Sequence, residues 1–524
     1  MIRRRAPYLA LIAGLLASPG VALDDPAPLS AIEWLDQAFR APALAPDPAP
    51  PPAPPPPLAD RLDFEPITAQ PLDAPDPDTT GLFAAARIDL PRAIWGPASM
   101  AELRDALDTL PGDTVPAAQQ LTLRLLLAEF APPVRGSDDL PGAMLAARVA
   151  ALIRFGALEQ ASQLLDAADL LTAPLAAKAF DVALLLGEED RACARMRDQV
   201  RLVHAQAAQI FCLARQGDWP VAHAALQVAT ALNTITTTEA QLLARFLYEE
   251  EAGDPAPAPP TDPSPLAWRI MEALGDPVTT ATLPVAFAHA DLRGTAGWRA
   301  QLDAAERLTR AGILQANRLL GLYAQSRPAA SGGVWERVRV VQELDRALDA
   351  QDADTIAARL IEAWPLFAAV ELDVALAQMF APRLAALDLP DEAGRLVWKF
   401  LVLAQDDPAR IAALAPNDDP LAHLITALAT GAEPPETEGP AMAAAIAAAF
   451  RTPPDALEHS DQMRAALDTG SAGLVLLRAL SQIADAAAGD PQLALRGLAG
   501  LRALALEAPA RQIAIELLLL QRRG

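Results

Sequence analysis

The sequence predicts an all-α fold: an α-solenoid of divergent helix–turn–helix repeats, preceded by a disordered, proline-rich segment. Apolar residues recur three and four positions apart over long stretches, as in MLAARVAALIRFGALEQASQLLDAADLL, residues 144–171. Alternating patterns rich in Val, Ile and Thr, which predict strands, are nearly absent. Turn-like sites recur at intervals of about 30 to 40 residues. Periodic helices that are interrupted at such intervals are typical of stacked helix pairs.

The turn-like sites fall into two series, followed by one later site. The first series, spaced 31 and 30 residues apart, comprises Gly156, Gly187 and Gly217. The second series, spaced about 39 and 38 residues apart, comprises Gly312, Gln351 and Leu389, and Gly489 is the later site. One longer pattern, L-x-R-x-G-x-L, occurs at 152–158 and again at 308–314. Because a helix pair has two apolar faces, it must stack on both of its neighbours to bury them.

Helix starts are marked by capping boxes, in which a Ser or Thr is followed three residues later by Glu. Three such pairs are Ser30 with Glu33, Ser99 with Glu102, and Thr236 with Glu239. Proline blocks both helix and sheet because it fixes φ and removes a backbone donor. Its clusters therefore divide the chain, with 14 prolines at 41–78 and 6 at 253–265.

These divisions predict the following organisation. The segments are a signal peptide (1–22), a short amphipathic helix at about 30–40 with a disordered proline-rich spacer (together 23–80), N-terminal helical repeats (81–252), a proline-rich loop (253–265), middle helical repeats (266–430), a linker (431–440) and C-terminal helical repeats (441–524). The first 22 residues have the basic start, short apolar run and small residues at Gly20 and Ala22 of a secretory signal. We expect cleavage after Ala22 and a periplasmic protein, with extracellular release as the alternative.

The charge of the chain excludes some partners. The formal net charge is −24, and removal of the three arginines of the signal peptide makes it −24 − 3 = −27. Nucleic acid and anionic membrane surfaces repel so acidic a chain. No segment of the mature chain is apolar for long enough to span a membrane, so we expect no stable insertion after the signal is cleaved.

The two cysteines, Cys193 and Cys212, suggest a disulfide, because an exported protein meets an oxidising compartment. In one unbroken helix they would lie about 28 Å apart, whereas a disulfide needs Cα atoms within about 7 Å. A bridge therefore requires a chain reversal, which we place around residues 199–206. Two buried thiols are the alternative.

The segments RQGDWPVAHAALQVATAL (215–232) and LPDEAGRLVWKFLVLA (389–404) resemble tetratricopeptide-like repeats in their small residues, aromatics and A-x-x-x-L spacing. The whole layout resembles secreted helical-repeat proteins of GC-rich Gram-negative bacteria, over most of residues 85–524. The resemblance implies a binding or scaffolding role and supplies no catalytic residues.

The tryptophans of the repeats are expected to wedge between helices, while one or two of them serve as binding anchors on the concave face. These are Trp219, Trp268, Trp298, Trp335, Trp364 and Trp398. Trp95 precedes a capping box and is expected to hold the start of the solenoid.

No catalytic, cofactor-binding or metal-binding motif has the required spacing, so we expect no cofactor and no enzymatic activity. The five histidines are isolated from one another, at His204, His223, His289, His423 and His459. DPDTTG (76–81) has the opening of a calcium loop, but Arg87 stands where a bidentate Glu is required, which favours a turn.

A short helix near the N-terminus is a candidate docking element. Its apolar residues are Ile32, Trp34, Leu35 and Phe39. An isolated helix of about a dozen residues is marginal in water, so it needs a surface to lie on, in cis on its own solenoid or in trans on another envelope protein.

Together these features predict a non-catalytic periplasmic scaffold or adaptor that mediates protein–protein interaction in the cell envelope. One alternative is a cell-wall-related enzyme with a superhelical domain, like the lytic transglycosylases. That reading requires a compact segment rich in Gly, Tyr and Asn around a Glu, and the chain has only three tyrosines. Another alternative is binding of a peptide or small ligand in the concave groove.

Overall fold

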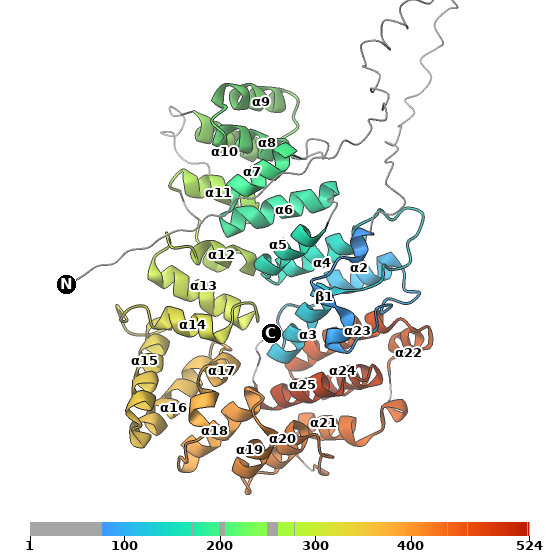
Figure 1. Cartoon of the computed structure of the whole chain (residues 1–524), viewed down its shortest axis with the longest axis vertical. Coiled ribbons are helices and arrows are strands. Elements are labelled where there is room, and N and C mark those ends of the chain that lie inside the picture. The colour runs from blue at the N-terminus through green and yellow to red at the C-terminus, as the bar shows by residue number, and fades with distance from the viewer. Residues whose placement is uncertain are drawn as a thin grey trace, which may run out of the picture. The chain divides into compact units, whose positions relative to one another are not determined.

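The computed structural model describes residues 76–168, 172–198, 205–248, 260–276, 278–437, 439–457, 459–520 and 522. Within these ranges the all-α prediction is confirmed (Figure 1). The strands described are two residues each, β1 (Phe83–Ala84) and β2 (Ala128–Glu129), which pair in parallel. Residues 72–524 form one compact unit. The predicted signal peptide, the N-terminal helix and the spacer up to residue 75 lie outside the described residues.

The helices follow one another in chain order with short connections. The first twelve are α2 (Met100–Asp108), α3 (Pro116–Leu127), α4 (Ala143–Arg154), α5 (Leu158–Ala167), α6 (Ala173–Leu186), α7 (Glu189–Asp198), α8 (Gln206–Arg215), α9 (Trp219–Ala231), α10 (Thr237–Leu247), α11 (Pro265–Ala273), α12 (Ala288–Asp291) and α13 (Trp298–Arg310). The next twelve are α14 (Ala316–Tyr323), α15 (Val334–Ala350), α16 (Ala353–Ala368), α17 (Asp373–Leu384), α18 (Asp391–Leu403), α19 (Pro408–Leu414), α20 (Pro420–Thr430), α21 (Ala441–Arg451), α22 (Asp461–Asp468), α23 (Ala472–Ala487), α24 (Pro491–Ala503) and α25 (Glu507–Leu519). Consecutive helices pack on each other, as α8 does on α9, α15 on α16 and α23 on α24. No helix in the described ranges is both long enough and apolar enough to cross a membrane.

Six of the seven turn-like sites lie just past the end of a helix, whereas Leu389 lies two residues before the start of α18. Five glycines among them have φ between 73° and 111°, namely Gly156, Gly187, Gly217, Gly312 and Gly489. Gln351 also adopts a left-handed conformation, with φ of 54°. A left-handed residue just past a helix lets the next N–H groups bond to its last carbonyls. The two L-x-R-x-G-x-L copies do this in the same way, because Ala157 N–H donates to Leu152 O at 2.8 Å and Ile313 N–H donates to Leu308 O at 2.9 Å.

The capping boxes at Ser99 and Thr236 are confirmed, with both reciprocal hydrogen bonds present. The turn prediction for DPDTTG is also confirmed, since residues Pro77–Thr79 form a 3-10 turn. Asp78 in that turn is fully buried. Its carboxylate accepts the N–H groups of Gly142 at 3.1 Å and Leu145 at 2.9 Å, so it caps the start of α4.

The first helices of the compact unit pack against its last helices, which the repeat pattern did not predict. In Figure 1, α3 lies beside α25 and α2 lies near α23, and both pairs are in contact. Gly473 N–H donates to Ile94 O at 2.7 Å. A Cβ placed on Gly473 would lie 2.4 Å from the ring of Trp95, so only glycine allows this approach. Trp95 is buried at this junction, with Phe130 packed edge-on at 5.3 Å.

Two buried carboxylates hold the C-terminal part of the chain, one to α3 at this junction and one to α17. Glu516 on α25 accepts the N–H of Ala117 at 2.7 Å, which lies in the first turn of α3. Burial raises the pKa of Glu516 to about 7. Asp373, at the start of α17, forms a buried ion pair with Arg522 near the C-terminus, with the closer N–O distance at 3.1 Å. Breaking a buried pair of this kind is costly, because it leaves one charge without compensation.

Candidate protein-interaction surface

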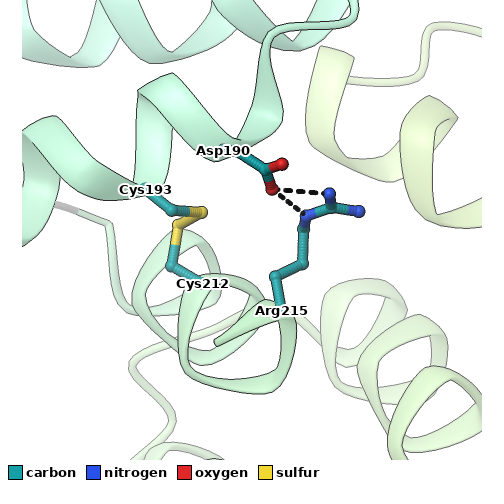
Figure 2. The surroundings of a disulfide bond; sticks show 4 residues. All are labelled: Asp190, Cys193, Cys212 and Arg215. Carbon is teal, nitrogen blue, oxygen red and sulfur yellow. Dashed lines mark hydrogen bonds and ion pairs between the residues drawn. A yellow bond between two sulfur atoms is a disulfide. The ribbon is translucent and has the colours of Figure 1, made fainter. Parts of the chain in front are cut away.

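The predicted disulfide between Cys193 and Cys212 is present (Figure 2). The Cα atoms of the two cysteines lie 5.2 Å apart, and both side chains are buried. The two cysteines lie on separate helices, because α7 ends at Asp198 and α8 begins at Gln206, and residues 199–204, where we place most of the reversal, lie outside the described residues. Closing a loop of this length contributes about 3 kcal/mol by restricting the unfolded chain. The bridge therefore fixes α8, the helix on which α9 packs.

A second contact joins α7 to α8 beside the disulfide. The guanidinium of Arg215 donates to Asp190 Oδ1 through Nη2 at 2.7 Å and through Nε at 3.3 Å (Figure 2). The side chain of Asp190 is 88 % exposed. Exposed ion pairs contribute little to stability, so the disulfide contributes more than this ion pair to holding the two helices together.

The inner face of α9 is an ordinary packing face. Ala222, Leu226 and Ala229 follow one another at helical spacing and are buried. They face α8 and α10, the helices that α9 contacts most. Gly217, with φ of 85°, turns the chain from α8 into α9, where Pro220 stands in the first turn. Local sequence therefore accounts for the start and the buried side of this helix.

A second side of α9 is apolar and exposed. We call Val221, Val228 and Leu232 the α9 apolar face; they are 49 %, 56 % and 64 % exposed. They are spaced i, i+7 and i+11, which places them on one side of a helix. The described residues contain eight large, exposed hydrophobic side chains, and half of them are these three and Trp219, which is 45 % exposed. In Figure 1, α9 stands at the edge of the fold, with α8 and α10 on its inner side.

The α9 apolar face also lacks charge. Residues 219–238 contain no Asp, Glu, Lys or Arg, although 21 % of the whole chain is charged. The titratable side chain in this stretch is His223, whose Nε2 lies 3.2 Å from Leu247 O and whose ring packs on Tyr248. Solvent-facing helices are ordinarily charged, so a neutral, apolar exposed helix marks an interaction surface.

Trp219 differs from the other repeat tryptophans. Trp268, Trp335 and Trp398 are buried, and Trp298 and Trp364 are partly buried against the core, as the packing prediction requires. Trp219 instead is exposed at the first turn of α9, with its ring 6.4 Å from that of Phe246. An aromatic ring packed on one side and open on the other is a typical binding anchor.

Other predicted features fall elsewhere. The candidate docking residues Ile32, Trp34, Leu35 and Phe39 lie outside the described residues, as does His204. Within the described ranges no three His, Cys, Asp or Glu side chains are grouped so that they could hold a metal ion. Among the described histidines the most buried is His289, whose Nε2 lies 2.6 Å from Gly156 O, and burial lowers its pKa. Its contact is with the backbone of a helix end, which is a structural role.

No family model, curated protein or solved structure matches the chain.

Proposed function

We propose that the protein is a non-catalytic scaffold or adaptor of the bacterial periplasm that holds another cell-envelope protein against the α9 apolar face. The observation that carries this proposal is the exposure of three large apolar side chains along one side of an uncharged helix. Leaving them in water is unfavourable, and covering them with a partner recovers that free energy. A stack of helices presents such a surface without the converging polar groups that catalysis needs.

The size of the α9 apolar face indicates what covers it. Three side chains that are each about half exposed offer roughly 300 Å² of apolar surface. A stable symmetric dimer needs about 800 Å² from each copy, so the face is too small for a second copy of this chain. It matches one face of a single amphipathic helix, and we assign that as the occupant, contributed by a partner protein.

Two features support the periplasm as the compartment. The first 22 residues have the pattern of a secretory signal, and the two cysteines of the chain are bridged. Disulfides persist in oxidising compartments such as the periplasm. The bridge has a direct role in this proposal, because it braces the helix pair on which α9 rests.

The test is a double substitution on the face, Val228→Gln with Leu232→Gln. Glutamine keeps the helix and removes the apolar surface, which should cost about 2 kcal/mol of binding, or roughly thirtyfold in affinity. Leu140→Gln is the matched control, because Leu140 is 70 % exposed and lies outside α9. The partner helix is identified by crosslinking in intact cells and mass spectrometry, and affinities are then measured with a peptide of that helix.

We expect the double variant to lose the peptide and the control to keep it. Equal affinity of the two variants would exclude the α9 apolar face as the docking surface. A crosslinked segment without apolar residues at helical spacing would exclude a helix as the occupant.

A further inference from the structure

A cavity of about 260 Å³ lies where α3 meets the C-terminal ends of α4 and α13. Its lining includes Arg154 and Arg310, which are the arginines of the two L-x-R-x-G-x-L copies. Each is the last residue of its helix. The fold thus brings two copies of one sequence pattern to the same cavity. A third arginine, Arg307, joins them from the last turn of α13.

Two of the three arginines are held in place by backbone carbonyls. Arg154 Nη2 donates to Leu107 O at 2.6 Å. Arg307 donates through Nη1 to Thr280 O at 2.7 Å and through Nη2 to Leu283 O at 2.6 Å. These bonds fix the orientation of both guanidinium groups before any ligand arrives, which lowers the entropy cost of binding.

The positive charge at the cavity is poorly compensated. Within the described residues, no carboxylate forms an ion pair with Arg154, Arg307 or Arg310, and Arg310 makes no polar contact. The lining contains one carboxylate, that of the exposed Asp113. Most arginines of this acidic chain pair with Asp or Glu, as Arg339 does with three glutamates. Three arginines at one cavity without such partners favour a bound anion.

Burial and repulsion between the arginines destabilise their charged forms, and a bound anion would stabilise those forms. Burial lowers the pKa of Arg154, and Asp108 offsets this only in part. Burial also lowers the pKa of Arg307, repulsion from Arg310 lowers it further, and Asp291 offsets only part of the change.

Two buried polar atoms of the lining have no hydrogen-bond partner. They are Thr114 Oγ1 and Gln119 Oε1, and each residue is only 8 % exposed. Gln119 Nε2 already donates to Gly112 O at 3.2 Å, so the atom of this side chain that lacks a partner is its acceptor, Oε1. Buried polar atoms are costly when unpaired, and those at functional sites are often completed by a ligand.

From this arrangement we infer that the cavity binds a single free amino acid with an aliphatic side chain. The carboxylate of the ligand meets the guanidinium groups of Arg154, Arg307 and Arg310. Its ammonium group donates to Gln119 Oε1 and to Asp113. The apolar part of the lining receives the side chain; it includes Leu123, Phe155 and Val285.

The volume of the cavity agrees with a ligand of this size. At about 30 Å³ for each water in the liquid, 260 Å³ corresponds to about nine waters. A branched-chain amino acid has about as many non-hydrogen atoms. The cavity and the α9 apolar face share no residues, so this proposal and the proposed function can fail independently.

The test is calorimetric titration of the mature chain with L-leucine, L-valine and L-methionine. Leucinamide lacks the carboxylate and 4-methylpentanoate lacks the ammonium group, so we expect each to bind at least tenfold more weakly than leucine. Arg310→Gln should weaken amino-acid binding at least tenfold and leave the melting temperature unchanged, since Arg310 makes no polar contact in the fold. Arg299→Gln makes the same charge change at the other end of α13 and should leave binding unchanged.

Three results would overturn the inference. One is the absence of detectable binding when each of the three amino acids is added to about 10 mM. Another is equal affinity of the Arg310→Gln variant and the unsubstituted protein. The third is tighter binding of the dipeptide Ala-Leu than of leucine, which would show that the site takes a peptide end instead of a free amino acid.

Discussion

Replacing Glu516 with glutamine should flatten the pH dependence of the protein's stability. Glu516 is 2 % exposed, and its carboxylate accepts the N–H of Ala117 at 2.7 Å and that of the Gln512 side chain at 3.1 Å. The residue before α3, Val115, provides no side-chain cap, so this distant glutamate serves as one. Glutamine retains the size and an acceptor oxygen but cannot ionise.

The magnitude follows from the pKa of this carboxyl group. Burial raises it to about 7 in the folded chain, against 4.5 for an ordinary glutamate. Between these pH values the folded state binds more protons than the unfolded state, so the free energy of unfolding falls as the pH rises. The contribution of Glu516 is therefore fully present below pH 4.5 and lost as the pH rises through 7. The gap between the two pKa values corresponds to about 3 kcal/mol.

Urea unfolding followed by circular dichroism at pH 4, 5.5 and 8 measures this contribution. From pH 4 to pH 8 the unsubstituted protein should lose about 3 kcal/mol of unfolding free energy relative to the Glu516→Gln variant. Arg522 and Asp373, the charged groups near Glu516, are the same in both proteins and cancel in the difference. Parallel stability curves for the two proteins would refute the reasoning.

Three further predictions concern the disulfide, the helix junction and the N-terminal segment. Replacing Cys193 and Cys212 with serine should lower the free energy of unfolding by about 3 kcal/mol and weaken binding at the α9 apolar face, as measured by denaturation and peptide titration. Gly473→Ala should destabilise the chain by about 1–3 kcal/mol through overpacking, whereas Gly321→Ala, in open space on α14, should stabilise it by about 1 kcal/mol; melting curves of the two variants decide. Deleting residues 23–75, which ends before the turn that caps α4, should leave the helical signal intact while weakening capture of the identified partner, and unchanged capture would remove the N-terminal helix from the docking account.

Local chemistry made much of the fold predictable from the sequence. Gly156 and Gly312 end helices because a left-handed residue is needed there, and Ser99 begins one because its side chain caps. The disulfide was predictable because Cys193 and Cys212 are the two cysteines of the chain. Each of these features depends on residues that are close in the sequence or on a unique pair.

The helix junction was not predictable in this way. The Glu516 contact with Ala117 joins residues 399 positions apart, and alanine is too common in this chain to mark its partner. Nothing in the local sequence distinguishes Gly473 from other helical glycines, because its contact is with the distant ring of Trp95. Long-range closure depends on the accumulated rotation of many divergent repeats, which small differences in helix length alter.

The α9 apolar face has one sign in the sequence. The 20 residues from 219 to 238 contain no Asp, Glu, Lys or Arg, although 21 % of the whole chain is charged. Trp219 was expected to be packed because most solenoid tryptophans are. Trp219 is exposed because neighbouring helices cover only part of α9, and the sequence does not show which helices those neighbours are.

Site-specific photo-crosslinking in intact cells shows whether the α9 apolar face holds a helix of another protein. A photoreactive residue is placed at position 228 and, in a second strain, at position 140, which is more exposed but lies outside α9. The account predicts that position 228 yields one defined adduct, whose crosslinked peptide has apolar residues at helical spacing, and that position 140 does not. The same adducts from both positions would contradict it.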